Sequence, residues 1–258
     1  MSDMVASAIR AKIEETIENM PGLSPTASKV LSLVDNIDAS PKELIRVIRM
    51  DPVLTARVLK LINSAHFGME QEVTSINRAL VILGLNTVKN LALSSAVVDL
   101  MADQTRGSEI SAELWSHCLW VGVAARVISR LRGLPRDQQE LAFVAGLLHD
   151  LGEVCMLKAD LDRYVNVVES IHGGRDQLEA ETETFGENHQ DIGALLAQRW
   201  GFPEALVVGI RHHHTPLVDG PHAWISCTIH LANELFFYEL RPVSDDGIPV
   251  APKPVKPV

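Results

Sequence analysis

Positive charge is scarce in this chain, which has 23 Lys and Arg residues against 33 Asp and Glu and a net charge of −10. Surfaces that bind nucleic acid or anionic membranes need clustered positive charge, so the composition argues against both kinds of partner. Long apolar runs are also missing, because no stretch reaches the roughly 18 apolar residues of a membrane span. The start, MSDMVASAIRAKIEE, lacks the apolar core of a signal peptide. We therefore expect a soluble, cytoplasmic protein.

Cysteine is rare as well. The three cysteines, Cys118, Cys155 and Cys227, are odd in number, widely spaced and embedded in apolar runs. This pattern indicates reduced thiols in the core of a protein from a reducing compartment, and it argues against a disulfide framework.

Alternating strand patterns and internal repeats are missing too, whereas helix signals are abundant. In SPKELIRVIRM, Ser40 can cap a helix that Pro41 opens, and in DPVLTARVLKLIN Asp51 and Pro52 repeat the arrangement. A further helix is expected to begin at Asn86. Behind it the periodicity predicts helices over 112–131, 135–157, 161–171, 185–200, 203–212 and 224–238. The fold class is therefore predicted to be all-α, as a two-part helical bundle.

The polar segment ADQTRGSEIS (102–111) lacks apolar periodicity and is the best internal boundary. We expect an N-terminal helical subdomain over 1–105 and a second helical subdomain over 106–240. The remaining residues, 241–258, hold five prolines in 18 residues, which is typical of a disordered or linker-like tail.

Histidine stands next to carboxylate in LLHDLGEV, where His149 and Asp150 follow a strongly apolar stretch. A buried carboxylate needs a compensating charge, and a metal ion would supply one. The alternative is that His149 is a partly exposed residue at a helix end. His117, in ELWSHCLWVGV, shares the apolar stripe of its helix, and is either a hydrogen-bonded core residue or a ligand.

Further imidazoles follow in ENHQDIGALLAQRW, which holds His189, and in IRHHHTP, which holds His212, His213 and His214. A histidine triplet at a helix C-terminus is also explained by a favourable interaction with the helix dipole. However, imidazoles from several helices lie near apolar stripes in the same half of the chain. Imidazole with carboxylate is the ligand set of Fe, Mn, Zn or Ni, so we predict a site for one or two such ions.

The order of these motifs resembles the HD superfamily of metal-dependent phosphohydrolases, and most closely its HD-related output domain branch, HDOD. In the first half the resemblance depends on DPVLTARVLKLINSAHFGMEQEVTSINRALVILGLNTVKNLAL. In the second half it depends on GLLHDLGEV, RWGFPEALVVGIRHHHTP and IHLANEL. It covers the chain from about Leu23 to Leu240, and it implies an HD-like helical domain in the C-terminal half.

The resemblance implies metal ligands, carried over by motif. The family pattern I-x-x-H-H-x-P fits Ile210, His213, His214 and Pro216, although a slip of one residue would use His212 and His213 instead. The implied ligand set is His117, His149, Asp150, His189, His213 and His214. If the site is catalytic, His149 and Asp150 are its central residues.

Three departures from the enzymes of the superfamily bear on activity. Asn233 stands where a final Asp ligand is expected, although His230, one turn earlier, could substitute. Glu153 replaces the lysine of the active cyclic-dinucleotide branch, and the HHE…GYP signature of that branch is replaced by HHHTPLVDG. Phosphate-binding groups are few, since only Arg211 and Lys158 lie near the proposed ligands in sequence.

Three hypotheses follow. The first is a bacterial signal-transduction module that binds metal, contacts signalling proteins, possesses no robust phosphodiesterase activity and forms a homo-oligomer in some contexts. The second is a metal-dependent phosphohydrolase acting on a nucleotide or cyclic dinucleotide. The third is a metal-free helical scaffold with a polar histidine network. The family hallmark NSAHFG (63–68) is interpreted separately, as a helix-terminating turn in which Asn63 and Ser64 bond the backbone.

Overall fold

A computed structural model describes residues 2–20, 25–34, 40–63, 71–85, 87–89, 91–92 and 108–239. Every regular element within these ranges is a helix and none is a strand, so the all-α prediction is confirmed. None of the helices in the described ranges is long and apolar enough to cross a bilayer. The helix expected from Asn86, Ser64 of the NSAHFG turn and the proline-rich tail lie wholly or partly outside the described residues.

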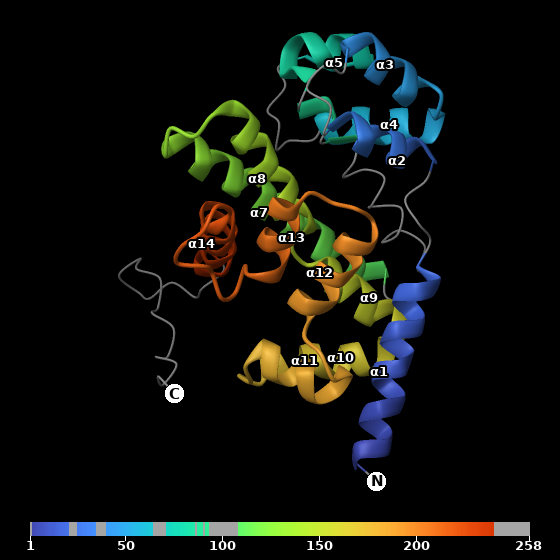
Figure 1. Cartoon of the computed structure of the whole chain (residues 1–258), viewed down its shortest axis with the longest axis vertical. Helices are drawn as coiled ribbons and strands as arrows, with labels where there is room; N and C mark the ends of the chain where they lie inside the picture. Colours follow the sequence, from blue (N-terminus) through green and yellow to red (C-terminus); the bar gives the residue numbers. More distant parts are fainter. Residues whose placement is uncertain are drawn as a thin grey trace.

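The first helices of the chain are α1 (Ser2–Asn19), α2 (Pro25–Val34), α3 (Pro41–Arg49), α4 (Pro52–Ile62) and α5 (Ile76–Leu83). The starts of α3 and α4 follow the predicted capping chemistry. The Ser40 hydroxyl accepts the main-chain N–H of Glu43 at 3.2 Å, and the Asp51 carboxylate accepts that of Leu54 at 2.9 Å. In Figure 1, α2 to α5 form a group of their own at one end of the molecule.

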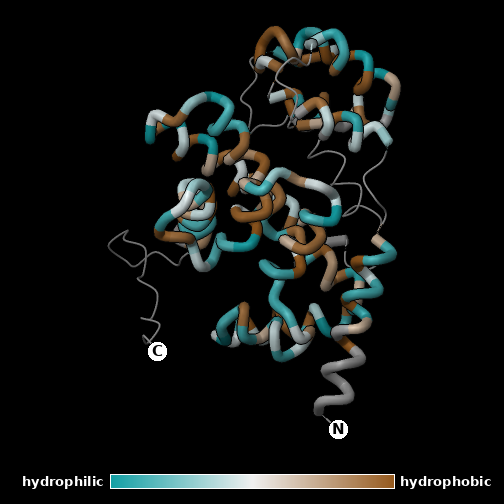
Figure 2. Tube along the Cα trace, viewed as in Figure 1, coloured by the Kyte–Doolittle hydropathy of each residue, from teal (hydrophilic) through white to brown (hydrophobic). Residues whose placement is uncertain are grey.

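The second part of the chain contains the longest of the described helices, and its helices lie beside and below the group formed by α2 to α5 in Figure 1. They are α7 (Ser108–Leu131), α8 (Arg136–Leu148), α9 (Leu151–Ala159), α10 (Leu161–His172), α11 (Gln177–Phe185), α12 (His189–Arg199), α13 (Glu204–Arg211) and α14 (Ala223–Glu239). In Figure 2, many hydrophobic residues lie where these helices meet, and many hydrophilic residues lie on the outer turns.

Two helix predictions in this part were wrong. The helix expected over 135–157 is interrupted at His149 and Asp150, which lie between α8 and α9. The helix expected over 185–200 begins four residues later, at His189, and α11, which ends at Phe185, was not predicted. The cysteine prediction also needs a correction, since Cys118 and Cys155 are buried but Cys227 is exposed on α14.

Glycine allows α9 and α12 to pack backbone to backbone. A Cβ atom on Gly152 would lie 1.9 Å from the carbonyl oxygen of His189, and one on Gly193 would lie 2.9 Å from the nitrogen of Gly152. No side chain fits in that space. The start of α12 is therefore held directly against the start of α9, one residue after Asp150.

The N-terminal helix does not lie with its neighbours in sequence. It packs against α9 and α11, as Figure 1 shows, and Lys12 forms an ion pair of 3.0 Å with Asp160. Arg199 of α12 donates to the carbonyl of Glu18 at 2.8 Å. The subdomain boundaries near 105 and 240 stay predictions.

The interpretation of Asn63 as a residue that bonds backbone after a helix is confirmed. The Asn63 side chain donates to the carbonyl of Val73 at 2.9 Å and accepts the N–H of Val73 at 2.8 Å. Asn63 thus bonds backbone directly after the end of α4, although its partner lies ten residues further on.

Candidate metal centre

The six predicted ligands converge from four places in the second part of the chain. His117 lies on α7, and His149 and Asp150 occupy the break between α8 and α9. His189 is the first residue of α12, and His213 and His214 follow the end of α13. His149, His189 and His213 have no exposed surface and Asp150 is 4% exposed, so the centre is buried.

The Asp150 carboxylate lies at the centre of the cluster. Its Oδ2 atom is 3.1 Å from Nε2 of His117 and 2.9 Å from Nε2 of His149. Its Oδ1 atom is 3.6 Å from Nε2 of His189 and 3.5 Å from Nε2 of His213. One carboxylate oxygen therefore faces each pair of imidazoles.

Within each pair the Nε2 atoms also face one another. They are 3.1 Å apart between His117 and His149, and 2.9 Å apart between His189 and His213. The ring of His214 lies next to the second pair, with centroid distances of 4.4 Å to His213 and 5.0 Å to His189. The cluster thus has two halves that share Asp150.

The outer nitrogens of three of these rings are already occupied. Nδ1 of His149 donates to the carbonyl of Gly146 and Nδ1 of His213 to that of Ile210, each at 2.7 Å. Nδ1 of His189 donates to the Glu181 carboxylate, also at 2.7 Å. Because a carbonyl only accepts, the proton of a neutral His149 or His213 is on Nδ1, and the Nε2 lone pair points into the cluster.

This arrangement fits a metal ion. Two nitrogens bound about 2.1 Å from one ion lie about 3.0–3.4 Å apart at the usual ligand angles, close to the 3.1 and 2.9 Å observed here. The contact between His149 Nε2 and Asp150 Oδ2 joins two acceptors at 2.9 Å unless a proton or a metal ion lies between them. The ligand atoms of His117, His149 and Asp150, and those of His189, His213 and His214, each lie within 4.8 Å of one another.

Burial and charge set the protonation of the cluster without metal. Burial opposes ionisation of Asp150, but the charge of His149 and hydrogen bonds from the surrounding imidazoles hold the pKa of this carboxyl well below its usual range. Burial lowers the pKa of His213 to about 3 and that of His214 to about 2. Burial also opposes the charge on His189, yet Glu181, and after it Asp150, raises the pKa of His189 to about 9.

The three consecutive histidines differ in whether they belong to the cluster. His213 and His214 contact the cluster, whereas His212 ends α13 and is absent from the groups of ligand atoms found in the described residues. His230 is absent from those groups as well, and its Nδ1 atom bonds the carbonyl of His213 at 2.8 Å. Asn233, however, is 2% exposed and faces the pocket, with its Oδ1 atom lacking a hydrogen-bond partner among the described residues.

Sequence reasoning missed the residues that support the cluster. Glu181 on α11 accepts both the Nδ1–H and the main-chain N–H of His189. Gln177 donates to Glu181 at 3.0 Å and to Glu153 at 2.7 Å, and the Tyr164 hydroxyl donates to Glu153. The segment QLEAETETF contains three glutamates, and no local signal indicates which of them is buried.

Glu153, which replaces the lysine of the active branch, belongs to the same hydrogen-bonded network. It is 8% exposed and held by Tyr164 and Gln177, so it belongs to the wall of the site. Burial, and after it the charge of Asp150, raises the pKa of Glu153 to about 7.

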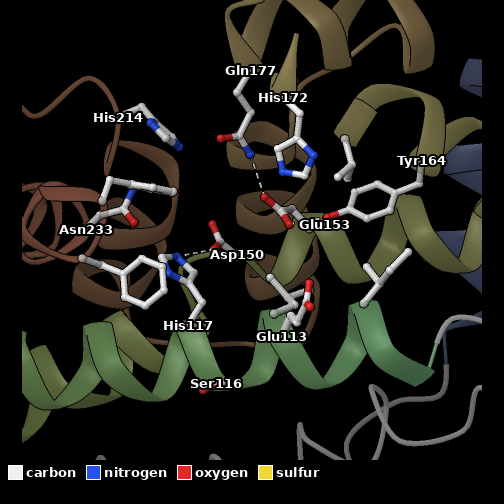
Figure 3. A pocket seen from close by; sticks show the side chains of 15 residues that line it. Glu113, Ser116, His117, Asp150, Glu153, Tyr164, His172, Gln177, His214 and Asn233 are labelled. Atoms are coloured by element: carbon white, nitrogen blue, oxygen red, sulfur yellow. Dashed lines mark hydrogen bonds and ion pairs between the residues drawn. The ribbon is translucent and has the colours of Figure 1, made fainter. Parts of the chain in front are cut away.

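A pocket of about 450 Å³ opens onto one side of the cluster, and Figure 3 shows its lining. Its lining includes His117, Asp150, Glu153 and His214, and Phe236 and Phe237 of α14 contribute apolar surface. The described residues that line it include no Lys or Arg. The two cations considered as phosphate ligands lie elsewhere: Lys158 lines a separate hollow between α1 and α9, and Arg211 is not among the pocket residues.

Comparisons with known proteins agree with this architecture. A family model described as the HDOD domain matches residues 20–216. A Shewanella amazonensis SB2B protein with the provisional name phosphohydrolase is 30% identical, with a TM-score of 0.76 over 92% of this chain and 84% of its own. An HDOD domain protein of unknown function from Geobacter sulfurreducens is 25% identical, with a TM-score of 0.74 over 98% of this chain and 83% of its own.

A curated relative is an uncharacterized protein of Treponema pallidum (strain Nichols), 31% identical over 219 residues. That match covers 83% of this chain but only 40% of the relative.

Proposed function

This chain belongs to the HDOD domain family, and on that premise we propose that it is a regulatory module whose His–Asp cluster holds one or two ions of Fe, Mn, Zn or Ni. The module acts by contact with signalling proteins, and it lacks robust phosphodiesterase activity. The ligands proposed are His117, His149, Asp150, His189, His213 and His214.

The observation that carries the metal proposal is the convergence of four Nε2 atoms on the Asp150 carboxylate. Three of the four rings have their Nδ1 atoms engaged by acceptors outside the cluster. Such outer bonds fix the ring orientation and leave the inner nitrogen free to bind metal. A purely structural network would need no such alignment of lone pairs.

The pocket argues for regulation over hydrolysis. Phosphoryl transfer needs positive groups that neutralise the charge on the phosphate oxygens, in addition to the metal. The described lining instead offers Glu113, Glu153 and Asp150, without Lys or Arg. Asn233, a neutral side chain, faces the pocket in place of a further carboxylate.

A second candidate is a metal-dependent phosphohydrolase acting on a nucleotide or cyclic dinucleotide. It is favoured by one observation, the pocket of about 450 Å³ that adjoins the cluster, which is large enough for a small ligand. Bound ions would supply Lewis acidity and an activated water, and His149 and Asp150 would be the central residues that hold them.

Metal content of purified, untagged protein tests the first proposal, and the histidine triplet provides a matched control. We expect near-stoichiometric Fe, Mn, Zn or Ni in the wild type and in His212→Ala. We expect a loss of metal in His213→Ala and in the His149→Ala/Asp150→Ala double variant, with helicity checked by circular dichroism.

Equal metal content in His212→Ala and His213→Ala would contradict the ligand assignment. No metal in the wild type, even after reconstitution, would favour the metal-free scaffold. Turnover of a nucleotide or cyclic dinucleotide that Asp150→Ala abolishes, with the fold intact, would promote the phosphohydrolase above the regulatory module.

A further inference from the structure

The two halves of the cluster differ in what holds the outer nitrogens of their histidines. In the half formed by His189 and His213, a buried carboxylate accepts from Nδ1 of His189 at 2.7 Å. In the half formed by His117 and His149, Nδ1 of His149 bonds only a neutral carbonyl. Nδ1 of His117 is buried and has no partner among the described residues. At the outer nitrogens, a hydrogen bond to a carboxylate therefore supports a histidine of one half and none of the other.

Both oxygens of this carboxylate, Glu181, accept hydrogen bonds. It is 1% exposed, and its Oε2 atom accepts the main-chain N–H of His189 at 2.9 Å as well as the ring Nδ1–H. Its Oε1 atom accepts from Gln177 at 3.0 Å. It also lies at the N-terminus of α12, where the helix dipole favours a negative charge. The bond to His189 is thus preorganised.

A carboxylate behind a histidine strengthens that histidine as a metal ligand. It orients the ring and increases the electron density on Nε2, and removal of such a partner costs roughly 10–100-fold in metal affinity. The proton that competes for Nε2 carries one unit of charge whereas a divalent ion carries two, so the Coulomb attraction of Glu181 favours the ion.

We propose that Glu181 makes the position around His189 and His213 the tighter of two metal positions, so that it fills before the position around His117 and His149. Glu181 acts as a positioning residue through His189 and does not touch the ion. This inference depends on the proposed function, because it assumes that the cluster binds metal.

Titration of metal-free protein with cobalt(II) chloride, followed by visible absorption and by calorimetry, tests the order. We expect two binding phases in the wild type, each with its own d–d spectrum. Glu181→Gln, which keeps an acceptor but removes the charge, is expected to weaken the tighter phase roughly 10–100-fold and to leave the weaker phase in place. Glu179→Gln, on the exposed face of the same helix, is the control and is expected to leave both phases unchanged.

His117→Ala gives a second, independent test that does not depend on how Glu181→Gln folds. It is expected to remove the weaker phase and its spectrum while the tighter phase persists. Unchanged phases in folded Glu181→Gln, or loss of the tighter phase in His117→Ala, would overturn the inference while leaving the metal proposal intact. A wild type that binds no cobalt would overturn the proposed function, and this inference with it.

Discussion

A methyl group on Gly152 should separate α9 from α12 and displace a ligand. The added Cβ would lie 1.9 Å from the carbonyl oxygen of His189, whereas real Cβ contacts are essentially never shorter than 3.0 Å. The start of α12 must therefore move by about 1.1 Å or more. Such a movement displaces His189 relative to Asp150 and Glu181, both of which it contacts.

The cost of Gly152→Ala can be worked from these contacts. Overpacking against rigid backbone costs about 1–3 kcal/mol, and weakening the charged hydrogen bond of His189 adds about 1.5–3 kcal/mol. The sum is about 2.5–6 kcal/mol, and in a chain of this size each kcal/mol lowers Tm by about 2–4 °C. We therefore expect a fall in Tm of at least about 5 °C for the metal-free protein, measured by scanning calorimetry in the presence of a chelator.

Gly173→Ala is the matched control. Gly173 has a φ of −73°, in the right-handed helical region, and the nearest atom to its added Cβ would be the carbonyl oxygen of Ser170 at 3.2 Å. Its Tm is expected to stay within about 3 °C of the wild type, because the conformational benefit of alanine offsets a slight crowding. A Gly152→Ala protein as stable as Gly173→Ala would refute the backbone contact between α9 and α12.

Three further outcomes are expected. In the metal-free protein the pKa of His189, about 9, exceeds its ordinary value of 6.5. The stability that protonated His189 adds to the fold is therefore complete below pH 6.5 and is lost as the pH rises through 9. Calorimetry should show a fall in Tm between pH 7 and 9, equivalent to a loss of at most about 3 kcal/mol in the free energy of unfolding. Glu181→Gln should flatten that slope, and an equal slope in both proteins would contradict the pairing. Asn63→Ala removes both hydrogen bonds to Val73 and should cost about 1–3 kcal/mol in urea unfolding, with Asn63→Asp in between; a wild-type midpoint in Asn63→Ala would argue against this role. A thiol reagent should modify Cys227 alone in the folded protein and three thiols after unfolding, because burial raises the pKa of the other two; rapid reaction of a second thiol would contradict their burial.

Local chemistry was predicted well from the sequence. The caps at Ser40 and Asp51 were correct because a cap depends on residues three positions apart. Most helices of the second part were predicted within a few residues, since their apolar periodicity reflects a buried face. The histidine motifs, read together with the family resemblance, identified residues that the fold brings into one cluster.

The sequence failed where long-range packing overrides local preference. LLHDLGEV continues a helical pattern, yet the helix is interrupted at His149 and Asp150, where both side chains face the cluster. Among the glutamates of α11, only tertiary packing selects Glu181 as the partner of His189. The choice between His212 and His214 was equally open, because adjacent residues differ only in the direction that the end of α13 gives them.

The sequence by itself thus determined the helical class, the starts of α3 and α4 and the residue types of the cluster, because caps and periodicity act within one or two helical turns. The tertiary structure decided which nitrogen of each ring points inward, which carboxylate supports it and how the two halves differ. The contacts that assemble the two halves join residues 24 to 63 positions apart, and their geometry is set by how the helices pack and not by any local pattern.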